Sequence, residues 1–331
     1  MTESKKKSQI QTIVIIAVIV AVCVIYNAAT GGKFFALNNI KTLVSHAIIP
    51  CFMAWALCFV FACDYTDMSI GAVVVLAANM AGFLGETKLG YFGIIIGAVG
   101  VSVALMVFNF FLFAKSQIPS WVASIGMVMV YEAIGIFYSN HQLQNGKTIA
   151  QLSDPMRGLA KAPAIYIVFI IGLIVAYIIY NRTTIGFSVR ALGSGEKIAQ
   201  AMGINTVKTV ILTGLICGLF VGCSAFLNES YSARIVVKTG LTSMTMIFQP
   251  IASLMLAQVL KNKINIIIGI PICALFVYGI FNMLTIAGVP SGTLQEAVLG
   301  LIVIVFAILA QRKQKKVVYL RNSLDARKTK Y

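Results

Sequence analysis

Ten long runs of apolar residues dominate this sequence, and they restrict its fold more than any other feature. The runs cover roughly residues 10–29, 43–63, 68–84, 89–114, 118–138, 163–180, 210–227, 241–258, 264–287 and 289–310. A helix needs about 17–25 predominantly apolar residues to cross a bilayer, and 59% of all residues here are hydrophobic. The sequence therefore predicts an all-α integral membrane protein with about ten transmembrane helices.

Two of these runs need an interpretation. The stretch 43–84 is too long for one span and is divided only by the five residues from Cys63 to Asp67. Near the N-terminus, Lys5 to Lys7 precede an apolar run from Ile10 to Tyr26, as in a secretory signal peptide. That run is longer than a typical signal-peptide core, so we expect it to be a retained first span.

The basic residues predict the orientation. With ten spans, 18 of the 26 Lys and Arg residues fall on the side of both termini, and the other 8 fall on the opposite side. Positively charged loops face the cytoplasm, so both termini are expected there. We interpret the net charge of +16 as a consequence of topology and of attraction to lipid headgroups, and expect no nucleic-acid partner.

The segments between the runs are too small for a soluble domain. The largest are 181–209, 139–162 and 311–331, and none can bury a hydrophobic core of its own. We expect one transmembrane domain over 1–310, a basic cytoplasmic tail over 311–331 and no catalytic residues. Gly146-Lys147-Thr148 imitates a phosphate-binding loop, but His141 stands where that motif requires glycine. The seven cysteines lack metal-like spacing, so no metal site is predicted.

The polar segment 181–209 interrupts the membrane pattern. It carries four basic residues and is expected to face the cytoplasm. Within it, Ser194 is suited to cap a short helix over 194–202, with Glu196 in its first turn and Gly203 just past its end. Ile198, Ala199 and Met202 share one face. Because so short a helix is unstable alone, we expect it to dock against a partner.

Three motifs in order resemble a known family. Residues Ala191 to Asn205 resemble the cytoplasmic coupling segment of ABC importer permeases of the ribose and simple-sugar class, whose superfamily includes branched-chain amino acid permeases. Asp67-Met68-Ser69-Ile70-Gly71 is similar to that family's acidic-Leu-Ser-Val-Gly motif. The stretch from Ile118 to Gly126 is similar to its Pro-x-x-Ala-(Thr/Ser)-Leu-Gly motif.

The resemblance implies a multi-pass subunit in a bacterial-type cytoplasmic membrane that translocates a small polar solute, with a simple sugar favoured. It implies an ABC ATPase partner holding ATP and Mg²⁺, an extracytoplasmic solute-binding protein, a second permease subunit (identical or related) and membrane lipid. This chain itself would bind no cofactor. The residues implied in ATPase coupling are Gly193, Ser194, Glu196, Ile198, Ala199, Met202 and Gly203.

The chain also departs from the family pattern. The region from Gly240 to Ser253 lacks the usual acidic residues, and Lys261-Asn262-Lys263 replaces a glycine turn. These departures leave the solute open, and they also leave open whether the partner permease subunit is identical or different.

Polar residues within apolar runs are candidates for the solute path, because polar groups in lipid are costly and usually face inward. They are Asp67, Ser69, Asn79, Asn109, Trp121, Ser124 and Glu132. Hydrogen bonding between helices is an equal alternative for Asn79 and Asn109, and Asp67 could simply cap the third span. Gly214, Gly218 and Gly222 form a stripe that lets a neighbouring helix approach.

Two functional classes therefore remain open. One is the permease subunit of an ATP-driven importer, and the other is an ion-coupled secondary transporter of a small solute. Secondary transporters place charged sites at broken helices, often within inverted repeats. The only intramembrane candidates for such sites are Asp64, Asp67 and Glu132, and the sequence has no convincing repeat.

Overall fold

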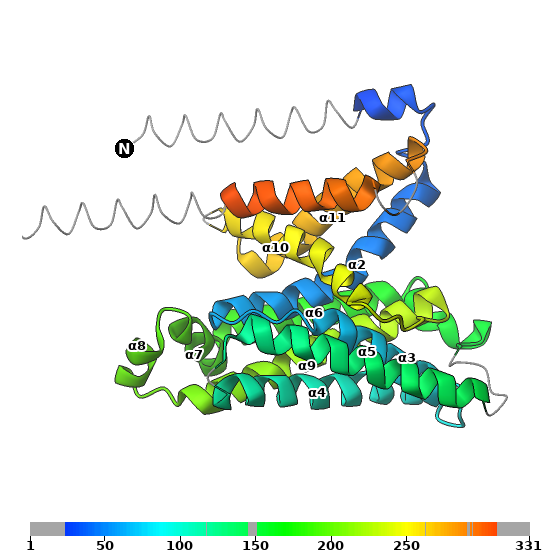
Figure 1. The fold of residues 1–331 in the computed structure, drawn as a ribbon. Helices are drawn as coiled ribbons and strands as arrows, with labels where there is room; N and C mark the ends of the chain where they lie inside the picture. Colours follow the sequence, from blue (N-terminus) through cyan, green and yellow to red (C-terminus); the bar gives the residue numbers. More distant parts are fainter. Residues whose placement is uncertain are drawn as a thin grey trace, which may run out of the picture.

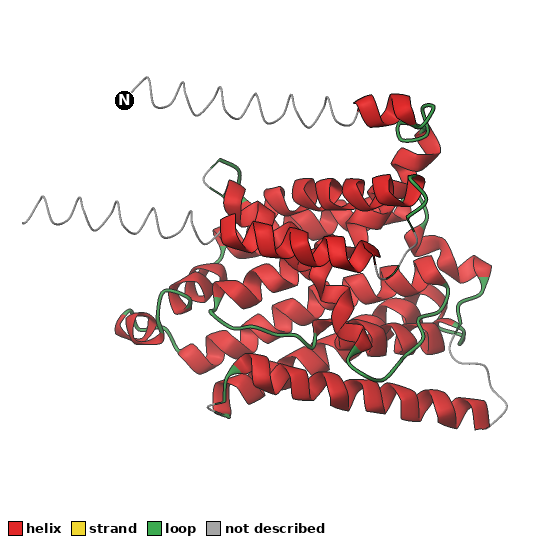
Figure 2. Cartoon of the chain, turned by 45° about the horizontal axis from the view of Figure 1, so that its top comes forward, coloured by secondary structure: helices red, strands yellow, loops and turns green. Residues whose placement is uncertain are grey.

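The computed structural model describes residues 24–116, 118–144, 151–261, 263–289, 292 and 294–309. All regular secondary structure in these residues is helical (Figure 2). The helices are α2 (Leu37–Ala62), α3 (Ile70–Gly85), α4 (Gly90–Lys115), α5 (Ser120–Gln144), η1 (Asp154–Ala160), α6 (Ala164–Arg182), α7 (Thr184–Leu192), α8 (Glu196–Ala201), α9 (Thr206–Ser232), η2 (Thr242–Ile247), α10 (Phe248–Leu260) and α11 (Ile266–Ile286). A further apolar helix covers Leu294–Leu309.

Seven helical segments of the described chain are long and apolar enough to cross a membrane: α2, α4, α5, η1 with α6, α9, η2 with α10, and α11. The helices α3 and Leu294–Leu309 are apolar but shorter. Nine of the ten expected apolar runs thus contain a helix. Most of the first run and the whole tail 311–331 lie outside the described residues, so ten spans and cytoplasmic termini stay predictions.

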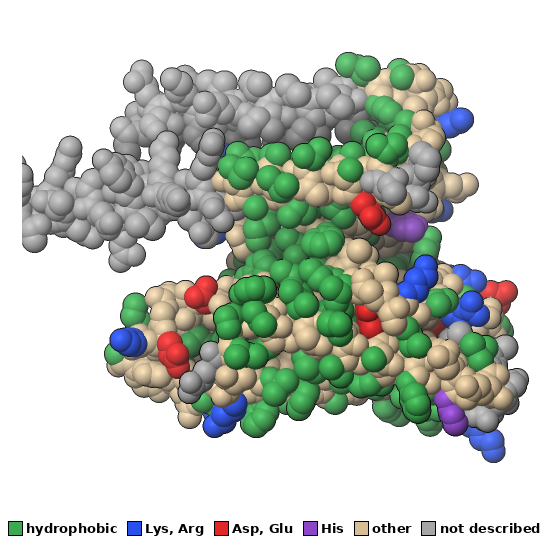
Figure 3. All heavy atoms as spheres, viewed as in Figure 1, with side chains coloured by type: hydrophobic (Ala, Val, Ile, Leu, Met, Phe, Trp, Pro, Cys, Tyr) green, Lys and Arg blue, Asp and Glu red, His purple; other side chains and the backbone are tan. Residues whose placement is uncertain are grey.

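The helices lie roughly parallel in two layers (Figure 1). One layer contains α3, α4, α5, α6 and α9, and the other contains α10, α11 and the helix Leu294–Leu309. Helix α2 joins the layers, with contacts to α6, α9, α10 and α11. Hydrophobic side chains cover the middle of the face seen in Figure 3, whereas charged side chains gather mainly toward its two ends. This distribution fits a molecule that lies across a bilayer.

Glycines line the most extensive helix–helix contact, between α4 and α9. A Cβ added at Gly218 would lie 2.5 Å from the Val103 Cα, and one added at Gly222 would lie 2.7 Å from the Val99 Cα. A Cβ at Gly214 would lie 2.9 Å from the Met106 carbonyl oxygen. All three distances are shorter than ordinary van der Waals contact, so the glycine stripe allows the two backbones to approach.

Candidate functional site

Helices α7 and α8 form a small structure that projects at one end of the bundle (Figure 1). The side chain of Thr183 caps α7 by accepting a hydrogen bond from the Gly186 N–H at 3.2 Å. Arg190 then ties α7 back to α6. Its Nη1 donates to the Tyr180 carbonyl at 2.6 Å, and its guanidinium lies 5.0 Å from the centre of the Tyr180 ring. These contacts hold α7 against a membrane helix.

Helix α8 is shorter than the sequence predicts. It covers Glu196–Ala201, and its N-cap is Gly195 with φ +133°, so the expectation that Ser194 caps this helix is wrong. The glycine conformation turns the chain away after Ser194, whose hydroxyl instead donates to the Arg190 carbonyl at 3.3 Å. At the other end, Gly203 follows the helix with φ +77°, which suits its expected place just past the helix end.

The apolar residues of α8 are divided between two environments. Ala199 is fully buried, whereas Ile198 is 54% exposed and Met202 is 50% exposed. The loop before the helix lies directly on the end of α2, because a Cβ at Gly193 would come within 2.1 Å of the Ala62 carbonyl oxygen. The structure therefore fixes one side of this element and leaves two large apolar side chains uncovered.

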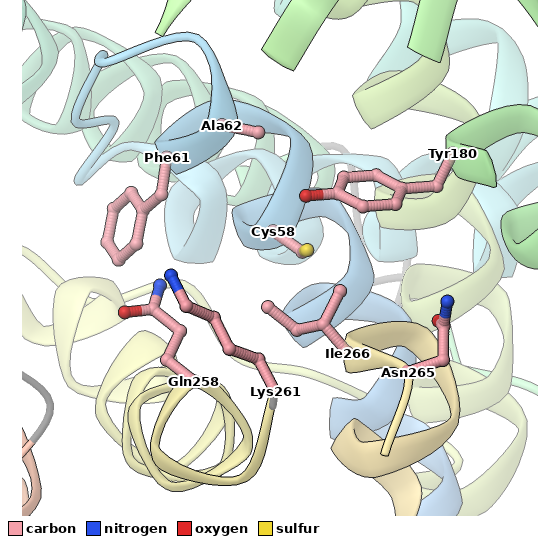
Figure 4. A pocket seen from close by; sticks show the side chains of 8 residues that line it. All are labelled: Cys58, Phe61, Ala62, Tyr180, Gln258, Lys261, Asn265 and Ile266. Atoms are coloured by element: carbon pink, nitrogen blue, oxygen red, sulfur yellow. The ribbon is translucent and has the colours of Figure 1, made fainter. Parts of the chain in front are cut away.

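A polar pocket of about 420 Å³ lies where the ends of α2, α6 and α10 meet the start of α11 (Figure 4). It is lined by Cys58, Phe61, Ala62, Tyr180, Gln258, Lys261, Asn265 and Ile266. The residues come from the ends of α2, α6 and α10 and from the start of α11. Asn265 is already engaged, since it exchanges hydrogen bonds with Asn181 and accepts one from the Ile267 N–H. Two of the lining residues also hold the segment of α7 and α8. Tyr180 contacts Arg190, and the Ala62 carbonyl lies against Gly193.

Three of the candidate solute-path residues, Asp67, Ser69 and Asn109, form one buried network with Tyr131 at the start of α3. Asp67 Oδ1 accepts hydrogen bonds from the Ser69 N–H at 2.8 Å and the Ser69 hydroxyl at 2.6 Å. The Asn109 amide donates to the Ser69 hydroxyl at 2.6 Å and lies 3.5 Å from Asp67 Oδ2. Tyr131 donates to Asn109 Oδ1 at 2.6 Å. The network joins the start of α3 to α4 and α5.

Glu132, the next residue along α5, binds the start of a different helix. Its carboxylate accepts hydrogen bonds from the Leu241 N–H, the Ser243 N–H and the Ser243 hydroxyl. The Ser243 carbonyl in turn lies against Gly71 of α3, where a Cβ would come within 2.1 Å of its oxygen. Acidic side chains at helix starts satisfy free backbone N–H groups. The geometry thus gives Asp67 and Glu132 roles in joining helices.

The remaining candidates lie apart from this network. Asn79 is buried in α3 and donates to the Val75 carbonyl at 2.8 Å, and its Oδ1 has no partner among the described residues. Ser124 is buried and donates to the Trp121 carbonyl. Trp121 itself is 54% exposed. None of the candidates lines the polar pocket at Tyr180, so a direct contact with solute stays a prediction for all of them.

A groove that the sequence did not single out lies between η2, α10 and the helix Leu294–Leu309. It has a volume of about 510 Å³ and includes the polar side chains of Thr245, Gln249 and Glu296. Thr245 follows Thr242 and Ser243, and Glu296 directly follows Gln295, so neither stands out in the sequence. The signal that could have indicated this place is Gln249, an amide immediately before Pro250 inside a span.

Comparison with known proteins identifies the family. The model of the family described as the branched-chain amino acid transport system/permease component matches residues 39–307. The chain belongs to this permease family. The match includes all of the helices that carry the junctions, the pocket and the groove, and it also includes α7 and α8.

Individual relatives of this permease are sugar importers by name. The ribose import permease of Escherichia coli K12 is 22% identical over 320 residues, which cover 94% of each chain. The fructose import permease of Rhizobium meliloti is 26% identical over 217 residues, or 61% of this chain and 60% of the relative. The galactose/methyl galactoside import permease of Treponema pallidum is 23% identical over 256 residues, or 68% of this chain and 48% of the relative. No solved structure gives a significant match.

Proposed function

We propose that this permease is the membrane subunit of an ABC importer that moves a simple sugar into a bacterial cell across the cytoplasmic membrane. The family match supports the permease role, and the names of the relatives support the substrate class. The alternative of an ion-coupled secondary transporter has less support. Two of its three candidate ion sites, Asp67 and Glu132, already accept hydrogen bonds from protein groups, and the third, Asp64, is exposed.

The observation that carries the ATP-driven role is the exposed apolar surface of α8. Ile198 and Met202 are both half exposed at the end of a polar segment, beyond the apolar helices. Water is an unfavourable surrounding for two large apolar side chains, and a helix of six residues needs tertiary contacts to persist. A groove in a separate ATPase subunit would cover both side chains.

The remaining partners follow from the same proposal. ATP and Mg²⁺ would be held by the ATPase, as the resemblance to ABC importer permeases implies. A solute-binding protein would deliver the sugar at the opposite face, near η1. A second permease subunit, identical or related, would complete the transmembrane path.

The test is co-purification of the affinity-tagged permease from membranes of its host, followed by identification of the bound subunits. We expect an ABC ATPase whose hydrolysis rises when the sugar-loaded binding protein is added. Ile198→Asp with Met202→Asp should reduce the recovered ATPase several-fold, because two charges cannot replace the apolar contact. Lys197→Ala, on the same helix, serves as the matched control. Recovery of the permease without any ATPase would refute the proposal, and undiminished recovery with the double variant would refute docking on α8.

A further inference from the structure

We propose that the groove between η2, α10 and the helix Leu294–Leu309 is a contact site for the transported sugar. The inference rests on the proposed function and assigns the solute to particular residues of this chain. The groove is lined by apolar side chains together with three polar ones. Its lining residues are Thr245, Met246, Phe248, Gln249, Glu296, Leu299, Gly300, Val303 and Ile304.

Packed apolar side chains connect the helices that form the groove. Leu299 of the last helix packs in a buried apolar cluster with Ala252 of α10 and with Val277 and Phe281 of α11. Phe248 and Val303 pack against the same cluster and also line the groove. The last helix is therefore packed against α10 and α11 beside the groove.

Gln249 is held in place by a second helix. Its Oε1 accepts a hydrogen bond from the Tyr278 hydroxyl of α11 at 2.5 Å. The Tyr278 ring lies 6.4 Å from the His46 ring on α2, and His46 Nε2 is 2.6 Å from the Tyr231 hydroxyl on α9. The amide nitrogen of Gln249 makes no hydrogen bond within the described chain, so both of its N–H groups remain available as donors.

Glu296 and Thr245 contribute acceptors. Both residues are exposed at the groove. The Thr245 hydroxyl donates to the Thr242 carbonyl at 2.8 Å, which leaves the lone pairs of its oxygen free. No hydrogen bond or ion pair of the Glu296 carboxylate occurs among the described residues. A carboxylate among apolar helices is costly unless water or a polar ligand meets it.

Donors and acceptors in one groove, with an aromatic ring in the same lining, match a neutral compound rich in hydroxyl groups. A hydroxyl both donates and accepts, so one sugar could donate to Glu296 and Thr245 and accept from Gln249. The Phe248 ring offers an apolar surface for the C–H face of the sugar. A lipid acyl chain would fill the volume but leave all three polar groups unpaired, which costs free energy.

The experiment measures uptake by the complete transporter, reconstituted in liposomes with its ATPase and binding protein. Radiolabelled D-ribose, D-fructose and D-galactose are the probes. For the sugar that the unsubstituted transporter moves, Gln249→Leu or Glu296→Leu should raise the half-saturating concentration about tenfold for each hydrogen bond lost. Tyr278→Phe, which frees Gln249 without removing it, should cause a smaller rise. Thr245→Val should weaken uptake, whereas Thr242→Val, in the same helical turn but outside the groove, should leave it unchanged.

A second measurement does not depend on transport. Glu296→Cys should react with a maleimide in the purified complex, and saturating sugar should slow that reaction, whereas Thr242→Cys should react at the same rate with and without sugar. Cross-linking of Glu296→Cys between two permease copies, without protection by sugar, would show that a second subunit fills the groove and would overturn the inference. Unchanged uptake in the Gln249 and Glu296 variants would overturn this inference and leave the proposed function intact. Uptake of no sugar by the unsubstituted transporter would overturn the proposed function as well.

Discussion

The carboxylate of Glu132 on α5 accepts two hydrogen bonds from Ser243, one from the N–H at 2.9 Å and one from the hydroxyl at 2.6 Å. The Leu241 N–H donates to the other oxygen at 3.0 Å, and Leu241 has the unusual φ of +64°. The preceding residue, Tyr131, joins the Asp67 network at the start of α3. Two consecutive residues of α5 therefore hold the starts of two different helices.

We predict that Glu132→Leu destabilises the permease strongly and that Glu132→Gln does so less. Leucine leaves the N–H groups of Leu241 and Ser243 without an acceptor, at about 1–3 kcal/mol for each donor that stays buried. Glutamine keeps one acceptor oxygen. Thermal stability in detergent, followed by the loss of the monodisperse gel-filtration peak, measures the effect. Equal stability of the leucine variant and the unsubstituted protein would show that this junction is dispensable.

We predict that Gly218→Leu prevents stable folding, because its side chain would have to enter the backbone of α4, 2.5 Å away at Val103. Gly100→Leu is the matched control, since Gly100 lies in a membrane helix and has no atom within 4 Å of an added Cβ. Expression level and thermal stability in detergent are the readouts. Similar losses in both variants would mean that leucine is harmful for a reason other than the α4–α9 contact.

We predict that Gly203→Pro uncouples transport from ATP hydrolysis while the protein remains in the membrane. Gly203 has φ +77° and donates its N–H to the Gln200 carbonyl at 2.9 Å, whereas proline has φ near −65° and no N–H. Gly203→Ala should cause a smaller defect, because alanine keeps the N–H. Glu196→Lys, which reverses the charge in the first turn of α8, is also expected to reduce coupling. Substrate-stimulated ATPase activity of the reconstituted complex is the measurement.

We predict that Lys161→Cys reacts with a membrane-impermeant maleimide added outside cells, and that Lys197→Cys reacts only after permeabilisation. Both residues are exposed, and the 19-residue helix α6, about 28 Å long, separates them. The unsubstituted protein gives the background, since five of its six described cysteines are buried and Cys223 is partly buried. The opposite labelling pattern would reverse the predicted orientation.

The sequence predicted the helices well because each span needs a long apolar run, and that requirement is local. It predicted less about the faces of those helices. Trp121 was expected to face inward with the other candidates but is 54% exposed, since in a membrane helix lipid and protein are both apolar surroundings. Hydropathy therefore does not distinguish the two sides of such a helix.

For the polar residues, the sequence predicted burial but not the bonding partners. Asp67, Ser69, Asn109 and Glu132 were expected to face inward, and all four are buried. Their partners on other helices are 22 to 111 residues away, for example Ser243 for Glu132, so no local pattern could indicate those contacts. The length of α8 was missed for a different reason, because the positive φ of Gly195 breaks the pattern after Ser194.

The contact between Gly193 and the Ala62 carbonyl has a mechanical consequence. Helix α2 is the most enclosed of the seven candidate spans in the described chain, and it contacts helices of both layers. Closely packed interiors have low compressibility and transmit strain. A force applied to the loop at 193 would thus reach the last turn of α2 with little slack, and α2 could tilt only by carrying α9, α10 and α11 with it. We therefore expect a displacement of this loop to be passed directly to α2.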